Sequence, residues 1–262
     1  MNRIDERFNK LKQENKKALI TFLTVGDPDI DTSEKAILIM QEEGVDLIEL
    51  GVPFSDPAAD GPTIQRADER ALENGTDIFK VFELVEKIRD KVEIPMVFLL
   101  YYNVIIQYGT EEFFARCAKA GVDGLIIPDL PYEESGEIKE YTEKYGVYQI
   151  NLVSPTSKNR IKDIAGNSKG FLYCISSLGV TGEKSSFNTN FEEVVGTIKK
   201  YSDIPACVGF GVSNGKQVKE LTQYFDGAIV GSAVVKAIAT GSSAEERLDN
   251  LRKKLNDLKS GL

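Results

Sequence analysis

Two acidic residues, Glu49 and Asp60, stand where acid–base chemistry is plausible. Glu49 interrupts an apolar run over residues 47–50, which predicts a short strand buried on both faces. Asp60 lies in the following loop, within DLIELGVPFSDPAADGPTIQ (46–65), whose prolines and glycines restrict the backbone. Glutamate is seldom buried without a role, and perturbed acids concentrate at functional sites. We therefore predict a functional site where the strand with Glu49 meets the loop with Asp60. The alternative is that a backbone amide satisfies Glu49 and that Asp60 caps a helix.

The chain contains no histidine, which removes many mechanisms. A Ser-His or Cys-His relay and a His-ligated zinc site are excluded. Proton transfer near neutral pH must come from a carboxylate, a tyrosine, a lysine or a thiol. The three cysteines, Cys117, Cys174 and Cys207, are odd in number and widely spaced. They are interpreted as reduced packing residues.

Composition narrows the class of protein. The 262 residues include 42% hydrophobic and 28% charged side chains, an ordinary globular balance. A net charge of -9 argues against nucleic-acid binding. No apolar run reaches membrane-spanning length, and the first ten residues lack the apolar core of a signal peptide. We expect a cytoplasmic protein that binds neither nucleic acid nor membrane.

Apolar strands and amphipathic helices alternate through eight β-then-α units without a linker. Such repetition predicts an α/β fold, a (β/α)₈ TIM barrel in a single domain spanning residues 1–262. A doubly wound open sheet is the competing fold, but it usually has fewer strands. Three helices are notable: an extra one at 4–13, one near 32–43 capped by Thr32 or Ser33, and an extra short one at 233–239 before the last at 244–258. The expected strands are 18–25, 47–50, 96–101, 124–127, 148–153, 171–175, 206–208 and 228–230.

In such a barrel the site lies at the carboxyl ends of the strands. No lysine stands at a predicted strand end, so a Schiff base has no nucleophile there. Glycines gather at the late ends: Gly211, and Gly231 with Ser232 directly before a helix. Backbone amides at such turns bind phosphate, although glycine also ends strands for packing reasons. Gly182, in a polar segment over 176–190 that we interpret as a lid, is a weaker phosphate candidate.

Large apolar residues near the strand ends form a further set. From the residues alone they are interpreted as core filling, because barrels bury such side chains in any case. The set comprises Phe22, Leu99, Tyr101, Ile126, Leu152, Tyr173 and Phe210.

Five motifs, in this order and spacing, resemble the tryptophan synthase alpha subunit family over essentially the whole chain. They are LIELGVPFSDPAADGPTIQ, PDLP, LGVTG, GFGVS and IVGSAVV. The resemblance implies a (β/α)₈ barrel that cleaves indole-3-glycerol phosphate to indole and glyceraldehyde 3-phosphate. It implies no cofactor and no metal in this chain. A beta subunit carrying pyridoxal phosphate is the implied partner, in an alpha2-beta2 assembly.

The resemblance also assigns roles. It implies that Glu49 is the general acid/base and Asp60 the partner of the indole N–H. Thr181 matches a lid residue that contacts Asp60. Ser177 and Ala58 depart from an arginine and a leucine in some members. The implied phosphate ligands are Gly182, Gly211, Gly231 and Ser232. The implied substrate contacts are the seven large residues listed above, which the resemblance assigns to the site rather than to the core. The implied beta-subunit contacts are Asp56, Pro57 and Asn103.

The chemistry of the two acids agrees with this reaction. Breaking the carbon–carbon bond is a retro-aldol step, and protonation of the indole ring makes the ring its electron sink. An acid with a raised pKa at Glu49 suits that protonation, and a carboxylate at Asp60 stabilises the positive charge on the ring. Apolar surroundings and a nearby carboxylate are both expected to raise the pKa of Glu49.

Three alternatives remain open from sequence. One is another phosphate-binding barrel, an isomerase or synthase of a phosphorylated aromatic. The second is a catalytically weak barrel that serves as an activating subunit. The third is a magnesium site at Glu49, Asp56 and Asp60. Assay of the isolated chain and a chelator separate these cases.

Overall fold

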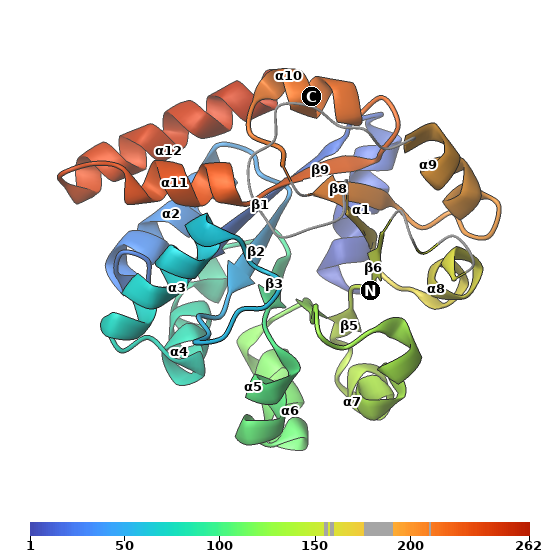
Figure 1. The fold of residues 1–262 in the computed structure, drawn as a ribbon, viewed down its shortest axis with the longest axis horizontal. Coiled ribbons are helices and arrows are strands. Elements are labelled where there is room, and N and C mark those ends of the chain that lie inside the picture. The colour runs from blue at the N-terminus through green and yellow to red at the C-terminus, as the bar shows by residue number, and fades with distance from the viewer. Residues whose placement is uncertain (155–156, 158–159, 176–190, 210) are drawn as a thin grey trace.

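The computed structural model describes residues 1–154, 157, 160–175, 191–209 and 211–262. Its centre is a parallel sheet in the order β5-β4-β3-β2-β1-β9-β8-β7-β6, ringed by helices (Figure 1). The strands are β1 Ala18–Thr24, β2 Leu47–Gly51, β3 Met96–Leu99, β4 Gly124–Ile126, β5 Tyr148–Gln149, β6 Leu152–Val153, β7 Leu172–Ile175, β8 Ala206–Gly209 and β9 Gly227–Val230.

The two ends of this sheet, β5 and β6, are halves of one interrupted strand. Tyr148 and Gln149 pair with β4, whereas Leu152 and Val153 pair with β7. Hydrogen bonds continue through the interruption: Ile150 N donates to the Leu125 carbonyl at 2.8 Å, and Tyr173 N donates to the Asn151 carbonyl at 3.0 Å. The strand thus changes partners along its length and closes the barrel. The predicted (β/α)₈ fold is confirmed.

The helices follow the predicted alternation, including the extra ones at the start and before the end (Figure 1). Among the described helices, none is both long and apolar enough to cross a membrane. The helices are α1 Arg3–Gln13, α2 Ile30–Glu42, α3 Pro62–Glu73, α4 Ile78–Ile88, α5 Tyr102–Tyr108, α6 Thr110–Ala120, α7 Gly136–Tyr145, α8 Ile161–Asn167, α9 Phe191–Lys199, α10 Gly215–Leu221, α11 Ser232–Ala239 and α12 Ala244–Lys259, with 3-10 turns at Arg89–Lys91 and Tyr132–Glu134.

Two local expectations were wrong. The cap of α2 is Asp29, whose carboxylate accepts the Thr32 amide at 2.7 Å, rather than Thr32 or Ser33. The third strand ends at Leu99 and a short helix, α5, follows it. Its YNVIIQY sequence is poor in strong helix formers, so intrinsic propensity does not reveal it. Burial of Ile105 against the core holds this helix in place.

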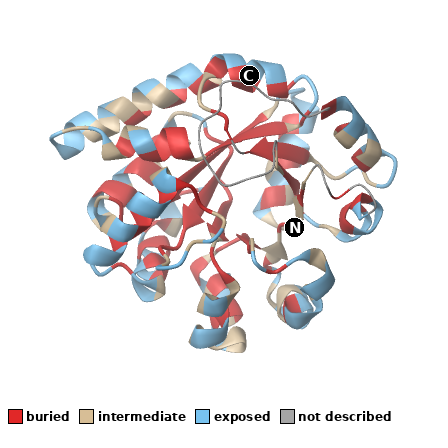
Figure 2. Cartoon of the chain, in the orientation of Figure 1, coloured by how far each residue is buried: buried red, intermediate tan, exposed pale blue. Residues whose placement is uncertain are grey.

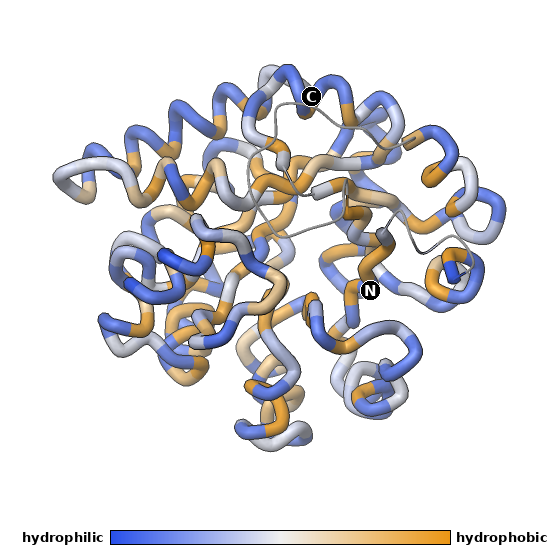
Figure 3. Tube along the Cα trace, viewed as in Figure 1, coloured by the Kyte–Doolittle hydropathy of each residue, from blue (hydrophilic) through white to orange (hydrophobic). Residues whose placement is uncertain are grey.

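Most strand residues of the barrel are buried (Figure 2). Tyr148 and Gln149 of β5 and Leu152 of β6 are half-buried. Residues of one parity, such as Ile20 and Val97, fill the barrel interior, and residues of the other parity, such as Leu19 and Phe98, pack under the helices. Apolar colour therefore concentrates on the strands and on the inner helix faces (Figure 3). The three cysteines are buried free thiols, as predicted.

Three aspartates secure the amino-terminal end of the barrel. Each precedes a strand, and its carboxylate accepts the amide of a residue on the neighbouring strand. Helix α1 lies across this end, and its Arg3 and Arg7 reach two of the aspartates. These contacts stabilise the amino-terminal end of the barrel. The carboxyl-terminal end is therefore the one available for an active site. The Asp46 carboxylate accepts the Leu19 amide at 2.7 Å, Asp123 accepts that of Met96 at 2.9 Å, and Asp226 accepts that of Ala206 at 3.0 Å.

Candidate active site

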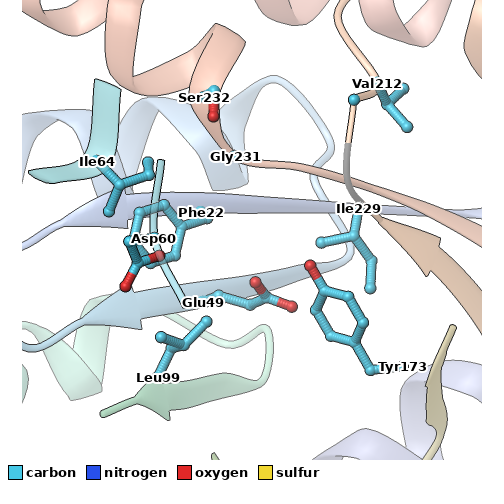
Figure 4. A pocket seen from close by; sticks show the side chains of 11 residues that line it. Phe22, Glu49, Asp60, Ile64, Leu99, Tyr173, Val212, Ile229, Gly231 and Ser232 are labelled. Carbon is cyan, nitrogen blue, oxygen red and sulfur yellow. The ribbon is translucent and has the colours of Figure 1, made fainter. Parts of the chain in front are cut away.

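A pocket opens at the carboxyl ends of the strands, where the sequence places the site (Figure 4). Eight of the predicted residues come together in it, from four strands, two loops and the start of α11. Three further residues, Ile64, Val212 and Ile229, also line it. The predicted residues are Phe22, Glu49, Asp60, Leu99, Tyr173, Gly211, Gly231 and Ser232.

Glu49 points from β2 into this pocket (Figure 4). It lies beside Phe22 on one neighbouring strand and Val97 on the other. The residue is only 1% exposed, and its Oε1 has no hydrogen-bond partner among the described residues. Burial raises the pKa of Glu49 from 4.5 to about 8. Desolvation alone accounts for the shift, so the contribution expected from a neighbouring carboxylate is not needed. Near neutral pH the group is a protonated acid.

Asp60 faces the same pocket from the loop between β2 and α3 (Figure 4). The Tyr101 hydroxyl donates to Asp60 Oδ2 at 2.7 Å and accepts the Ala59 amide at 2.9 Å. Burial raises the pKa of Asp60, while the bond from Tyr101 works in the opposite direction. The N-cap of α3 is Gly61, so Asp60 does not have the capping role of the alternative interpretation. Tyr101, predicted as a substrate contact, is not among the residues that line the pocket, and its hydroxyl contacts Asp60 instead.

Two glycines make room for the aromatic walls of the pocket. A Cβ on Gly51 would lie 2.5 Å from the Phe22 ring, and one on Gly209 would lie 2.4 Å from the Tyr173 hydroxyl. Neither position accepts a side chain without displacing its ring. These glycines therefore shape an apolar slot between two aromatic residues, a surface suited to a flat aromatic ligand.

The other end of the pocket suits an anion. Gly231 is the N-cap of α11, and the first amide to bond back to it is that of Val234, at 2.9 Å. The amides of Ser232 and Ala233 precede that bond, at the positive end of the helix. A Cβ on Gly231 would come no closer than 3.6 Å to Phe22, so the backbone here is approachable. Gly211, with φ of +92°, lines the same end.

Several predicted residues lie elsewhere. Ile126 is fully buried and Leu152 half-buried, both packed in the barrel interior. Thr181, Gly182 and Phe210 lie outside the described residues, as does Ser177. Their assignments stay predictions.

One buried acid escaped the sequence reasoning. Asp68, on α3, is 5% exposed, and the Thr24 hydroxyl donates to its Oδ1 at 3.3 Å. A signal was present: Asp68 follows Ile64 by four residues and so shares the buried face of the helix. The negative charge of Asp60 contributes to a raised pKa of Asp68.

The magnesium alternative requires Asp56 to join Glu49 and Asp60. Asp56 is exposed, and the Ser55 hydroxyl donates to it at 2.5 Å. Within the described ranges, no three His, Cys, Asp or Glu side chains are grouped so as to hold a metal ion.

A barrel with two buried acids and a helix amino end in one pocket at its carboxyl-terminal lip is typical of (β/α)₈ enzymes that act on phosphorylated substrates. Comparison with known proteins is more specific. The family model described as tryptophan synthase alpha chain matches residues 8–262. The tryptophan synthase alpha chain of Thermoanaerobacter sp. (strain X514) is 50% identical, covering 100% of each chain. That of Caldanaerobacter subterraneus subsp. tengcongensis is 50% identical over 96% of each.

Solved structures agree. A chain in the structure of Mycobacterium tuberculosis tryptophan synthase is 38% identical, with a TM-score of 0.90 over 99% of this chain and 98% of that one. The chain belongs to the tryptophan synthase alpha chain family. It is a lyase of tryptophan biosynthesis that cleaves indole-3-glycerol phosphate to indole and glyceraldehyde 3-phosphate.

Proposed function

We propose that Glu49 and Asp60 divide the work of this cleavage. Protonated Glu49 delivers its proton to the indole carbon that carries the glycerol side chain. The ring then holds a positive charge, which ionised Asp60 stabilises by accepting a hydrogen bond from the ring N–H. The observation that carries this proposal is the buried, unpartnered Oε1 of Glu49 in a pocket shared with Asp60.

Glu49 both donates and recovers a proton in this reaction. Once Glu49 has given up its proton, its carboxylate accepts the proton of the hydroxyl on the adjacent carbon. The electrons of that O–H bond form the aldehyde carbonyl, the carbon–carbon bond breaks, and its electrons return to the ring to release indole. Glu49 ends the cycle protonated, and the ring needs neither a lysine nor a metal to accept electrons.

The substrate phosphate belongs at the opposite end of the pocket. We assign it to the amides at the start of α11, next to Gly231 and Ser232, with Gly211 beside them. The indole then lies in the aromatic slot between Phe22 and Tyr173. The pocket reaches from the acids to this helix end, so one molecule spans both.

The test is indole release by the purified chain supplied with indole-3-glycerol phosphate. Glu49→Gln and Asp60→Asn each keep the side-chain shape and are expected to lose at least about 100-fold in kcat. Asp56→Asn, an exposed loop acid, is the matched control and keeps its activity. Near wild-type turnover in Glu49→Gln refutes the assignment. Wild-type inactivity of the isolated chain points instead to an activating subunit.

The partner is assigned to the same rim. We infer that a beta subunit, which holds the pyridoxal phosphate, docks on the β2–α3 loop and on α5, in an alpha2-beta2 complex in the cytoplasm. Asp56 and Asn103 are exposed and Pro57 is half-buried. Ile106, on α5, is 56% exposed. Sedimentation with a purified beta subunit tests this, and Ile106→Glu is expected to weaken the complex by at least about tenfold.

A further inference from the structure

Asp68 is a further buried carboxyl, on α3, and the charge of Asp60 acts on it. It is 5% exposed, as is Asp60. Thr24, at the end of β1, donates its hydroxyl to Asp68 at 3.3 Å. Arg70, two residues further along α3, is held by Asp27 through two hydrogen bonds of 2.7 and 2.8 Å. Arg70 is therefore committed to another acid, and Arg66, two residues before Asp68 on the same helix, is exposed.

The charges around Asp68 are mostly negative. Asp60 contributes from the β2–α3 loop, Asp27 from the β1–α2 loop and exposed Glu69 from α3 itself. Strand β1 carries no charged residue, and Lys236 of α11, the helix packed on α3, is exposed. Tyr101, which bonds to Asp60, also feels the charge of Asp68. Burial first, and then the charge of Asp60, raises the pKa of Asp68 to about 8, whereas the Thr24 hydroxyl lowers it.

We propose that Asp68 is a positioning residue that acts through Asp60. While Asp68 is a neutral acid, Asp60 carries the single negative charge of the pair and turns it toward the pocket. When Asp68 ionises, two carboxylates repel each other in a dry environment. Asp68 is fixed in a helix and Asp60 belongs to a loop, so Asp60 is displaced and the site is lost. This inference rests on the proposed role of Asp60.

The alkaline limb of the pH profile tests the proposal. Two groups, Glu49 and Asp68, must then both be protonated for activity. The wild-type kcat/KM is expected to fall by up to about 100-fold per pH unit above pH 8, because two protons are lost. Asp68→Asn mimics the neutral acid permanently, so its kcat/KM falls by only about 10-fold per unit. At pH 7 the variant stays within about twofold of wild type, because Asp68 is already neutral there.

Glu69→Gln is the matched control, because it removes one exposed charge beside Asp68 and leaves the acid in place. The steep limb is expected to persist in it. A merely structural role for Asp68 predicts an Asp68→Asn enzyme that is weaker by the same factor at every pH, with an unchanged slope. That outcome overturns the proposal.

A second measurement does not depend on turnover. Carboxyl NMR of the full chain follows the titration of Asp68 in wild type and in Asp60→Asn. Removing the charge of Asp60 is expected to move the Asp68 titration to lower pH, and an unmoved titration refutes the coupling. Failure of the proposed function is separate: Asp60→Asn then keeps its activity, whatever Asp68 does.

Discussion

The Tyr101 hydroxyl joins Asp60 to the backbone of the preceding residue. It donates to the Asp60 carboxylate at 2.7 Å and accepts the Ala59 amide at 2.9 Å. The ring itself stacks on Phe54, with centroids 5.0 Å apart. One hydroxyl therefore fixes both the loop and the direction of the acid, while the stacked ring is a separate anchor.

Tyr101→Phe removes this hydroxyl and keeps the stacking. The bond from Tyr101 favours the ionised form of Asp60, so its loss raises the pKa of that carboxyl. The acid limb of kcat/KM is expected to move to higher pH by about 1 unit or less. An acid limb that coincides with wild type contradicts the assignment of Asp60 as the ionised partner.

Glu49 is expected to weaken the fold as pH rises. Its pKa is about 8 in the folded chain, against 4.5 ordinarily. A raised folded-state pKa gives stability that is present below about pH 4.5 and is lost as pH rises through about 8, reaching a loss of ~3 kcal/mol at pH 7. Glu49→Gln has no such proton linkage, so its stability relative to wild type should increase from about pH 5 to about pH 9. Urea unfolding across that window measures it, and a constant difference disproves the burial argument.

Ser232→Glu probes the phosphate end. A carboxylate at the start of α11 suits the helix dipole, so the fold is expected to survive. It repels the substrate phosphate, and KM should rise by at least about tenfold, while Ser232→Ala changes it little. Gly211→Val is a poorer probe, because φ of +92° strains a branched residue. Equal KM values for the two Ser232 variants would remove the phosphate from this helix end.

Arg7→Ala tests the base of the barrel. Arg7 Nε donates to Asp46 at 2.8 Å, and the Asp46 side chain is only 6% exposed. Its removal leaves a buried carboxylate without its cation and is expected to cost about 1–3 kcal/mol of stability with no change in kcat. Lys253→Ala breaks an exposed pair with Asp249 and should change stability by less than about 0.5 kcal/mol. Similar losses in both variants would mean that the base aspartates do not tie the barrel.

The periodic part of the structure was predictable. The alternation of strands and helices predicts the barrel, and Glu49 in an apolar strand predicts a buried acid at its lip. Features that depend on tertiary packing could not be predicted from the sequence. Helix α5 has little intrinsic propensity. Helical spacing indicates only that Asp68 is buried, whereas its hydrogen bond with Thr24 depends on the packing of α3 against β1. The roles of Gly51 and Gly209, which seat Phe22 and Tyr173, require the distances between strands.

The division of one strand into β5 and β6 affects where the native barrel opens locally. Each half is paired to a different neighbour, and outside it a hollow between α7 and α8 reaches Gln149 and Asn151. Water thus approaches residues 148–153 more closely than it approaches strands that are covered by helices. Local opening of the native barrel should therefore begin between β5 and β6. Amide hydrogens of residues 148–153 should exchange before those of β1 and β2.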